Sequence, residues 1–267
     1  MVHFPNAKIN LGLNVIERRP DGYHNLETVF YPVKPCDILE VIRADRFSFR
    51  QTGLEMGIPA DENLVVKAFR MMEKQFDLPP VKIHLHKVIP AGAGLGGGSS
   101  DAAFMLKMVN ELYGTGCTGE QLRGMAGTLG SDCPFFIFNT PSLATGTGHV
   151  LESIGVDLKG YHLVVVKPAL SVSTAMAYRA VTPRKPVESL PSILARGVET
   201  WKGRLVNDFE EPVCNIFPEI GEIRDTLYRL GAVYASMSGS GSAVYGLFTE
   251  LPVALKEWFP DGTTVFL

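Results

Sequence analysis

A glycine-rich segment, PAGAGLGGGSSDAA at residues 90–103, constrains the fold more than any other part of the chain. Apolar and polar side chains alternate before it at residues 81–86, and apolar residues at helical spacing follow it at residues 102–113. The sequence therefore predicts a strand, a glycine loop and a helix that begins near residues 99–100. Clustered glycines leave backbone N–H groups bare, and a helix N-terminus adds further N–H groups and its positive dipole end. This arrangement predicts an anion site, with phosphate as the expected ligand.

The glycine spacing by itself leaves several ligand classes open. Gly92-x-Gly94-x-x-Gly97 matches the fingerprint of dinucleotide-binding folds. Such a fold also needs a second strand ending in an acidic residue about twenty residues further on, and Glu111 falls inside the predicted helix instead. No Gly-Lys-Ser or Gly-Lys-Thr occurs, and the chain holds neither His-Arg-Asp nor Asp-Phe-Gly, which excludes Walker-type and protein-kinase loops. A flexible linker is the plain alternative, and the regular strand and helix beside the loop disfavour it.

The charge of the chain argues against a polyanionic or lipid partner. The net charge is −3 at pH 7 and the sequence pI is about 6.1, so no general field attracts nucleic acid or an anionic membrane. With 267 residues, 46% of them hydrophobic and 20% charged, the chain is expected to form one large or two ordinary globular domains. We expect a small-molecule substrate, no nucleic acid, no membrane and no obligate protein partner.

Cysteine and histidine usage predicts no metal site. The four cysteines are far apart in the sequence: Cys36, Cys117, Cys133 and Cys214. Their spacing indicates neither a zinc site nor a disulfide framework. Residues 1–8 lack the apolar run of a signal peptide, so a cytoplasmic location is expected. His84 and His86 share one face of a predicted strand, and without a third ligand we expect a solvated face there.

Hydrophobic periodicity along the chain predicts an α+β fold. Strands are expected at residues 7–14, 26–33, 38–42, 81–86, 135–138, 142–145, 161–167, 234–237 and 243–248. Helices are expected at residues 61–74, 118–129, 218–230 and 251–258, after the glycine loop, and from residue 173 onward. Thr118 and Gln121 have the spacing of a capping box. The pattern thins out at residues 148–160, so we predict two domains, at residues 1–155 and 156–267.

Three further clusters are candidates for chemistry. Lys8, Asn10 and Asn14 share one face of the first predicted strand, where an ordinary solvated face is the alternative. Asp132 lies in a short loop before an apolar run, where a turn-forming role is the alternative. Residues 238–242 (SGSGS) predict either a hairpin turn or a second nest of N–H groups. A phosphate loop, a lone basic strand residue and a loop carboxylate together suit phosphoryl transfer.

Five segments together resemble one kinase superfamily. Residues 90–103 are similar to the phosphate loop of the galactokinase, homoserine kinase, mevalonate kinase and phosphomevalonate kinase (GHMP) superfamily. More narrowly, residues 5–13 (PNAKINLGL) and 21–28 (DGYHNLET) resemble the branch that phosphorylates a cytidyl diphosphate derivative of methylerythritol. Residues 130–136 (GSDCPFF) and 238–241 (SGSG) fit the same branch. Several motifs in the expected order are far more specific than any one of them.

The resemblance implies both a fold and a reaction. The fold would be a two-domain GHMP kinase with an N-terminal ribosomal-protein-like domain, a left-handed βαβ crossover and a C-terminal ferredoxin-like domain. The reaction would transfer the γ-phosphoryl group of ATP, with Mg²⁺, to the 2-hydroxyl of the cytidyl diphosphate substrate in the non-mevalonate isoprenoid pathway. Two alternatives stay open: another GHMP kinase, of the homoserine or mevalonate type, or a nucleotide-binding module without catalysis.

The resemblance also implies roles for individual residues. Asp132 would be the general base, and Lys8 its charge partner beside the acceptor hydroxyl. Residues implied near the adenine are Asn63, Leu64 and Lys87. The implied ATP phosphate loop comprises Pro90, Ala91, Gly92, Ala93, Gly94, Leu95, Gly96, Gly97, Gly98, Ser99 and Ser100. Those implied for the acceptor substrate are Asn10, Tyr23, His24, Thr174 and Tyr178. We predict that cytosine stacks on Tyr178 opposite Tyr23 and that His24 contacts its Watson–Crick edge. The alternative for Tyr178 is a half-buried helix residue that packs on the core.

Two departures from the family pattern accompany these assignments. Ser131 and Cys133 flank Asp132 where the family has Ala and Val, and both changes are small. No residue matches the glutamate that holds Mg²⁺ in some superfamily members, so the resemblance implies the ion without identifying its protein ligands.

Overall fold

The structure, a computed structural model, describes residues 1–267, which divide into two compact units. The first unit comprises residues 1–8, 32–91 and 96–140, and the second comprises residues 9–31, 92–95 and 141–267. This division differs from the single boundary predicted at residue 155. Two long strands, β2 (Asn6–Arg18) and β3 (His24–Cys36), contribute residues to both units, which sequence periodicity does not reveal. None of the helices has both the length and the apolar character needed to cross a membrane.

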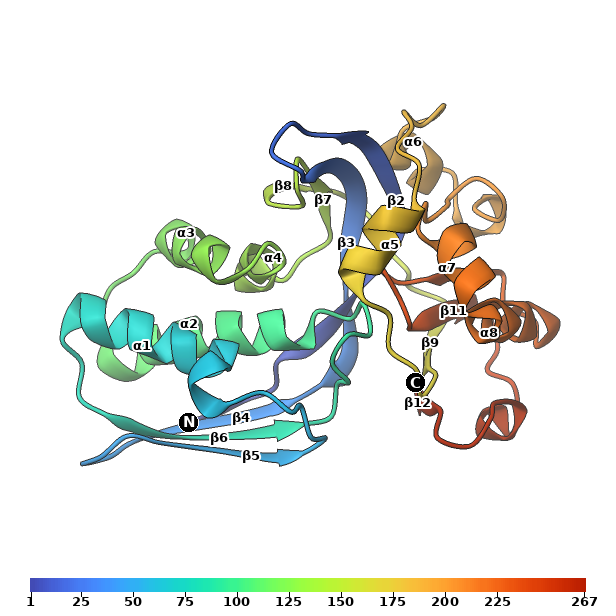
Figure 1. Ribbon diagram of the computed structural model, residues 1–267. Helices are drawn as coiled ribbons and strands as arrows, with labels where there is room; N and C mark the ends of the chain where they lie inside the picture. Colours follow the sequence, from blue (N-terminus) through green and yellow to red (C-terminus); the bar gives the residue numbers. More distant parts are fainter. The chain divides into compact units, whose positions relative to one another are not determined.

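The first unit is built around a four-stranded sheet in the order β1-β4-β6-β5 (Figure 1). Its elements are β1 (Val2–His3), β4 (Ile38–Arg43), β5 (Ser48–Gly53), β6 (Val81–Lys87), η1 (Ala60–Glu62), α1 (Leu64–Phe76), α2 (Gly97–Tyr113), α3 (Gly119–Leu129) and α4 (Cys133–Phe138). β5 and β6 pair in parallel and are joined through α1, which is a βαβ crossover. The other pairs are antiparallel.

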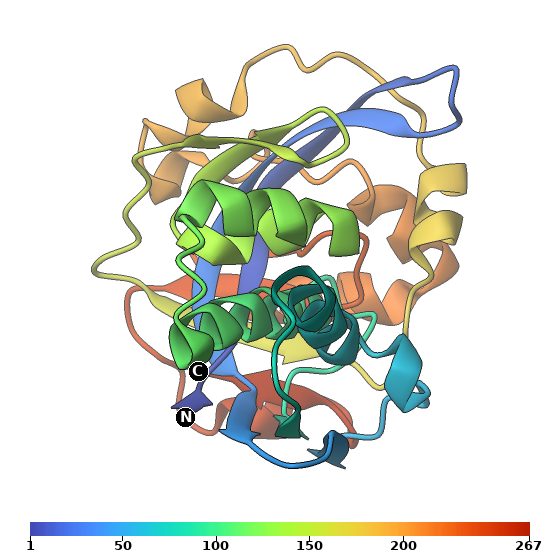
Figure 2. The ribbon, with the colours of Figure 1, turned by 90° about the vertical axis from the view of Figure 1, so that its left-hand side faces the viewer.

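Helices cover one face of this sheet in two layers (Figure 2). α1 and α2 lie next to the sheet, and α3 and α4 pack on the other side of α2. Asn63 caps α1, since its side chain accepts a hydrogen bond from the N–H of Val65 at 2.9 Å. α2 lies between two layers, which explains why small and apolar residues line most of its circumference. The glycine loop therefore ends at the start of a helix that is fixed on two sides.

The second unit contains an antiparallel sheet in the order β10-β11-β9-β12 and the sheet β2-β3-β7-β8. Its further elements are β7 (Ser142–Thr145), β8 (Val150–Ser153), β9 (His162–Lys167), α5 (Thr174–Ala180), α6 (Leu190–Leu194), η2 (Val198–Thr200), α7 (Glu210–Ile216), α8 (Pro218–Arg229), β10 (Tyr234–Met237), β11 (Val244–Phe248), η3 (Leu255–Trp258) and β12 (Thr264–Phe266). The chain order strand, helices, strand, strand, short helix, strand is ferredoxin-like, as expected.

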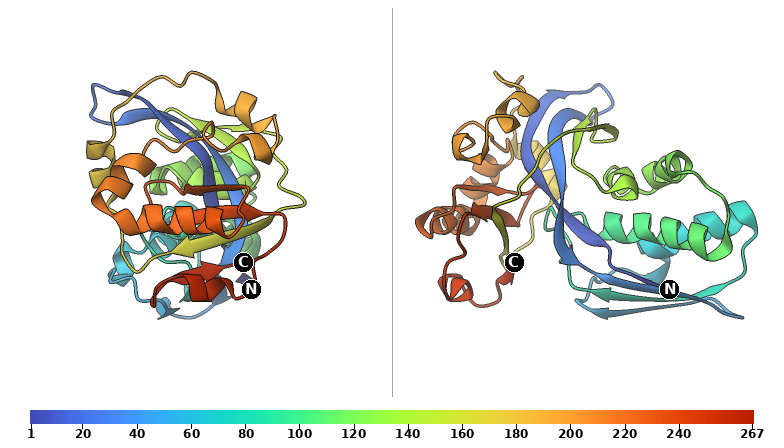
Figure 3. Two further views of the ribbon diagram at one scale, coloured as in Figure 1. Left: turned by 90° about the vertical axis from the view of Figure 1, so that its right-hand side faces the viewer. Right: turned by 180° about the vertical axis from the view of Figure 1, so that it is seen from behind.

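Helix α8 lies across the ferredoxin-like sheet (Figure 3). It buries Ile220, Ile223 and Leu227, which recur at helical spacing, against a core that includes Val164 and Val166 of β9. Burying side chains of this size stabilises the unit by about 1.5–3 kcal/mol each.

Most predicted elements are confirmed, with boundaries that differ from the prediction by at most four residues. The capping box is present: the Thr118 hydroxyl accepts from the N–H of Gln121 at 3.3 Å, and the Gln121 side chain accepts from the N–H of Thr118 at 2.8 Å. α5 begins after Ser173, and α8 occupies the predicted segment. The helix after the glycine loop starts at Gly97, slightly earlier than predicted.

Two predicted elements are wrong. The run at residues 135–138 is helix α4 and not a strand, because short apolar runs do not distinguish the two and Pro134 occupies the first helical turn. The helix predicted at residues 251–258 is only the 3-10 turn η3, since Ala254 before it adopts a left-handed conformation with φ 54°. The sequence also missed the strands β1, β5, β8 and β12 and the short helices α6 and α7. The four strands lie at sheet edges, where little burial imposes an alternating pattern.

Candidate active site

Lys8 and Asp132 are brought together in the first unit. The Lys8 Nζ lies 3.5 Å from Asp132 Oδ2. Only 4% of the Lys8 side chain is exposed, compared with 32% of the Asp132 side chain. Burial lowers the pKa of Lys8, and the neighbouring Asp132 carboxylate opposes this shift. The pair thus joins a buried cation to a carboxylate that solvent reaches.

The polar face of β2 is buried, so the solvated face considered for Lys8, Asn10 and Asn14 is wrong. These residues are 3%, 2% and 4% exposed. The side-chain amide of Asn10 donates to Thr28 Oγ1 at 2.9 Å, and the backbone carbonyl of Asn10 accepts from the Tyr245 hydroxyl at 2.9 Å. Buried polar groups need such partners. This face of β2 is therefore a polar surface inside the protein, with hydrogen bonds at Asn10.

Asp132 owes its position to the start of α4. It is the residue before Cys133, at which the helix begins, and Pro134 fits the first helical turn. Phe135, Phe136 and Ile137 are buried and hold α4 in place. A short helix with a buried apolar side therefore presents the carboxylate at its N-terminal end.

The end of the glycine loop lies against this pair. Gly96 has φ 71°, a left-handed conformation that glycine adopts readily. A Cβ added at Gly96 would lie 3.0 Å from the Phe136 ring and 3.2 Å from Lys8 Cε, so a side chain there would disturb Lys8. A Cβ at Gly98 would meet nothing closer than Leu64 Cδ1 at 3.9 Å. The first turn of α2 thus has an open side at Gly98, where its N–H groups lack intrahelical acceptors.

The middle of the glycine loop packs against the second glycine segment inside the second unit. A Cβ at Gly94 would lie 2.0 Å from the carbonyl oxygen of Ser238, which leaves no room for any other residue. The Ser238 hydroxyl donates to the Gly94 carbonyl at 2.9 Å, and the Ala243 N–H donates to the Ala93 carbonyl at 3.1 Å. Residues 238–242 therefore support the glycine loop directly, in addition to forming the turn between β10 and β11.

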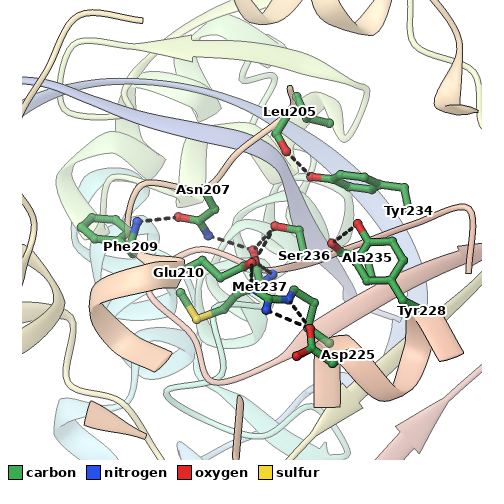
Figure 4. A network of polar contacts seen from close by, with 11 residues as sticks. Leu205, Asn207, Phe209, Glu210, Asp225, Tyr228, Tyr234, Ala235, Ser236 and Met237 are labelled. Carbon is green, nitrogen blue, oxygen red and sulfur yellow. Dashed lines mark hydrogen bonds and ion pairs between the residues drawn. The ribbon is translucent and has the colours of Figure 1, made fainter. Parts of the chain in front are cut away.

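A buried polar network holds this second glycine segment (Figure 4). The Asn207 amide donates to the carbonyls of Met237 and Gly239, both at 2.8 Å. Glu210 accepts from the Ser236 hydroxyl at 2.8 Å and from Arg224 Nη1 at 2.8 Å. The sequence analysis missed Asn207 and Glu210, because nothing local in the sequence shows that they reach a segment about thirty residues away.

Aromatic rings of the second unit form a short stack. The rings of His24 and Tyr178 are stacked with centroids 4.9 Å apart at 21°, and Phe209 meets Tyr178 edge-on at 4.8 Å. Tyr23 is 68% exposed. Burial and the nearby Arg18 charge lower the pKa of His24. The ring of Tyr178, on which cytosine is predicted to stack, is thus covered by the ring of His24.

Thr174 and Asn63 occupy the positions at which their elements begin. Thr174 starts α5, and its hydroxyl lies 3.0 Å from the Ser240 hydroxyl of the second glycine segment. Asn63 caps α1 and also donates to Gln51 Oε1 at 3.4 Å. Leu64 follows it and is the residue nearest to the open side of Gly98. Thr174 thus contacts the second glycine segment, and Leu64 lies beside Gly98 of the first.

The resemblance implies that Lys87 lies near the adenine, and in the structure its side chain is buried between two carboxylates. Its side chain is 1% exposed, and Nζ donates to Asp37 Oδ2 at 2.5 Å and to Asp101 Oδ2 at 2.7 Å. Both carboxylates are buried, and burial raises the pKa of Asp101 to about 7 against the opposing effect of the Lys87 charge. The Lys87 ammonium is therefore engaged inside the protein, and its implied place near the adenine stays a prediction.

The carboxylates that hold Lys87 were not among the candidate residues. Asp101 belongs to the quoted glycine segment but was taken only as part of its pattern, and Asp37 is a lone acid between two strands. The chain holds no group of three or more His, Cys, Asp or Glu side chains arranged for a metal ion. His84 and His86 instead contact one hydroxyl, that of Thr52, at 2.8 and 2.9 Å.

The fold and this site define a class: a small-molecule kinase in which a glycine loop leads into a helix beside a lysine–carboxylate pair. Comparison with known families agrees. The family described as GHMP kinases N terminal domain matches residues 63–140, and GHMP kinases C terminal matches residues 192–257.

Comparisons with individual proteins narrow this class. A 4-diphosphocytidyl-2-C-methyl-D-erythritol kinase of Parabacteroides distasonis is 54% identical over 257 residues, which cover 96% of this chain and 94% of the relative. One of Bacteroides thetaiotaomicron is 52% identical over 271 residues, covering 100% and 98%. The chain belongs to the GHMP kinases and, within them, to the 4-diphosphocytidyl-2-C-methyl-D-erythritol kinase family.

Solved structures support the same placement. A crystal structure of 4-(cytidine 5'-diphospho)-2C-methyl-D-erythritol kinase matches with a TM-score of 0.80 and 35% identity, covering 99% of this chain and 98% of that one. Mevalonate kinase of Methanococcus jannaschii matches with a TM-score of 0.73 and 15% identity, covering 100% and 96%. The second likeness shows the shared fold alone.

Proposed function

We propose that this kinase transfers the γ-phosphoryl group of ATP to the 2-hydroxyl of 4-diphosphocytidyl-2-C-methyl-D-erythritol. The observation that carries the proposal is the Lys8–Asp132 pair, 3.5 Å apart, with Gly96 of the glycine loop against Lys8. Phosphoryl transfer needs a group that accepts the proton of the acceptor hydroxyl and a positive charge that stabilises the developing anion. Asp132 supplies the first and Lys8 the second.

The surroundings of the pair suit these two roles. Asp132 is about one third exposed, so an acceptor hydroxyl can approach the carboxylate from solvent. Lys8 is almost wholly buried, and a charge acts more strongly where water is excluded. The two side chains come from β2 and from the start of α4, both of which are anchored by buried neighbours. Rigid placement of this kind favours catalysis by orientation.

We assign the ATP phosphates to the glycine loop, residues 90–100. Glycine at residues 96 and 98 leaves N–H groups of the first turn of α2 accessible, and the dipole of this seventeen-residue helix favours an anion there. Asn63 and Leu64 would lie toward the adenine, since Leu64 borders the open side of Gly98. Mg²⁺ in nucleotide sites takes most ligands from phosphates and water. No step above depends on the ion.

We assign the cytidyl group to the aromatic stack of the second unit. Cytosine would take the place of the His24 ring on Tyr178, and the displaced His24 would turn its ring nitrogens to the base edge. Tyr23, Thr174 and Asn10 would complete the substrate side. A base stacked on an aromatic ring gains about 1–3 kcal/mol, or roughly 5- to 150-fold in affinity.

The reaction is tested with ATP and four acceptors: the cytidyl diphosphate of methylerythritol, galactose, homoserine and mevalonate. We expect turnover with the first alone. Preferred phosphorylation of homoserine or mevalonate would replace this proposal with another GHMP kinase activity. The remaining alternative is a nucleotide-binding module without catalysis, and single-turnover measurement with labelled ATP tests it. Binding of ATP without phosphorylation of any of the four acceptors would support that alternative.

The cytidyl assignment has its own test in two Tyr178 variants. Tyr178→Ala should raise KM for the cytidyl substrate about 5- to 150-fold and leave KM for ATP nearly unchanged, because only the stacking ring is lost. Tyr178→Phe keeps the ring and should be almost silent. An unchanged cytidyl KM in the Ala variant, or equal damage in the Phe variant, would remove Tyr178 from the substrate side.

A further inference from the structure

Three buried charges meet beneath the glycine loop in the first unit. Lys87 is the last residue of β6, Asp37 separates β3 from β4, and Asp101 lies in the first turns of α2. Their side chains are 1%, 0% and 2% exposed. Lys87 Nζ bonds to both carboxylates, at 2.5 Å and 2.7 Å. Three ionisable side chains thus occupy a buried position that apolar side chains could fill as well.

Stability alone does not explain such a cluster. Removing charges from water costs several kcal/mol per ion, and apolar replacements of buried ion pairs are often neutral or stabilising. The cluster is also imperfectly satisfied, because Asp101 Oδ1 and the neighbouring Ser100 hydroxyl are buried without a hydrogen-bond partner. A buried, costly and partly unsatisfied cluster suggests a role in function.

The contacts of the cluster lie at both ends of the glycine loop. At the entry, Asp37 Oδ1 accepts from the N–H of Val88 at 2.6 Å and from that of Ile89 at 2.9 Å. At the exit, Asp101 ties the start of α2 to Lys87. A Cβ at Gly97 would lie 2.8 Å from the Ile89 side chain and 3.3 Å from Lys87 Nζ, so helix and cluster are in close contact.

We propose that Asp37, Lys87 and Asp101 form a clamp that fixes the distance between the entry and the exit of the glycine loop and so positions its N–H groups for the ATP phosphates. Asp37 holds the entry, Asp101 holds the exit, and Lys87 joins the two. The three are positioning residues, since their buried side chains bond to one another and to the backbone at residues 88 and 89. This inference rests on the proposed binding of ATP phosphates by the loop.

The experiment compares Asp101→Asn with Arg43→Met. The first keeps the side-chain shape and removes the charge that binds Lys87. The second, a matched control, acts at the opposite end of α2, where Arg43 Nη2 donates to the Leu112 carbonyl at 2.7 Å. We expect KM for ATP to rise about tenfold in Asp101→Asn at about pH 8.5, as loss of a charged hydrogen bond predicts, with KM for the acceptor unchanged. Arg43→Met should leave both unchanged.

The pH dependence of KM for ATP distinguishes the clamp from a purely structural role of Asp101. The charged groups facing Asp101 are Lys87 on β6 and Asp37 before β4. Below a pKa of about 7 the wild-type side chain is protonated and resembles Asn, so the ratio of the variant and wild-type KM for ATP should approach one at about pH 6. Titration of ATP itself cancels in this ratio.

Hydrogen exchange keeps the proposal testable if the kinetics are ambiguous. In Asp101→Asn without ligand, the amides of Val88 and Ile89 should exchange about tenfold faster than in the wild type and in Arg43→Met. A flat KM ratio with unchanged exchange, or an equal effect of Arg43→Met, would overturn the clamp. If the wild-type enzyme itself showed no ATP-dependent thermal shift, the assignment of the loop to ATP would fail first.

Discussion

The two buried lysines of the first unit are an instructive pair. Lys8 and Lys87 are 3% and 2% exposed, and consecutive glycines of the loop border them: Gly96 lies against Lys8 and Gly97 against Lys87. Lys8 has a carboxylate at 3.5 Å that is about one third exposed, whereas both carboxylates of Lys87 are buried within 2.7 Å. Solvent reaches the carboxylate of the first pair, whereas the carboxylates around Lys87 are enclosed by protein. Two lysines buried to a similar degree therefore have very different surroundings.

The largest effect is expected at the Lys8–Asp132 pair. Asp132→Asn should fold normally and lose about 10²–10⁴-fold in kcat, because positioned proton transfer contributes that much. Binding of both substrates should change little. Steady-state kinetics and thermal unfolding measure these quantities, and a variant that keeps half of the wild-type turnover would break the comparison.

Exchanging each lysine for methionine separates stability from catalysis. Lys87→Met leaves two buried carboxylates without a cation and should cost about 3–5 kcal/mol in the free energy of unfolding. Lys8→Met removes a buried charge whose partner is solvated, so stability should hold while kcat falls about 10²–10³-fold. Urea unfolding beside kcat tests the contrast. Equal destabilisation by both variants would show that the two lysines have the same structural role. An effect of Lys8→Met on KM for ATP alone would assign Lys8 to nucleotide binding.

Gly98→Ala tests the loop that borders both lysines. Gly96 and Gly97 are unsuitable, because a Cβ there would press on Lys8, Phe136 or Ile89. At Gly98 the added methyl meets no protein atom closer than 3.9 Å, so alanine should stabilise the helix by about 0.5–1 kcal/mol. The same methyl would cover the N–H groups assigned to phosphate and should raise KM for ATP about tenfold. Improved stability with unchanged ATP affinity would return the loop to a structural role.

The smallest expected effect is the pH dependence of stability. The folded-state pKa of Asp101 is raised to about 7, so the native protein binds more protons than the unfolded chain between about pH 4 and pH 7. The stability contributed by this proton is present at low pH and lost as the pH rises through that window. Asp101→Asn should therefore gain about 1 kcal/mol over the wild type between pH 5 and pH 8 by urea unfolding. A constant difference would show that Asp101 is ionised throughout.

Local sequence features were sufficient for several parts of the site. The capping box at Thr118, the helix opening at Ser173 and the helix after the glycine loop each depend on residues within one or two turns, so pattern and structure agree. The glycine loop was recognised for the same reason. Edge strands and the helix α4 were missed or misassigned, because their burial is set by partners distant in sequence.

The two lysines show the limit of such patterns. The sequence marks Lys8 and Lys87 alike, as basic residues in or directly after an alternating strand, and the family resemblance assigned both to the site. Only the structure shows that one meets Asp132 and the other is enclosed by Asp37 and Asp101.

The sequence by itself determined the fold class, the kinase family and the position of the glycine loop before α2, since motifs and periodicity are properties of neighbouring residues. Tertiary structure decided which carboxylate each lysine meets, that the polar face of β2 is buried, and that Ser238 supports Gly94. The physical reason is that desolvation and pairing depend on what closes over a side chain. Those groups come from segments that lie tens to hundreds of residues apart in this chain.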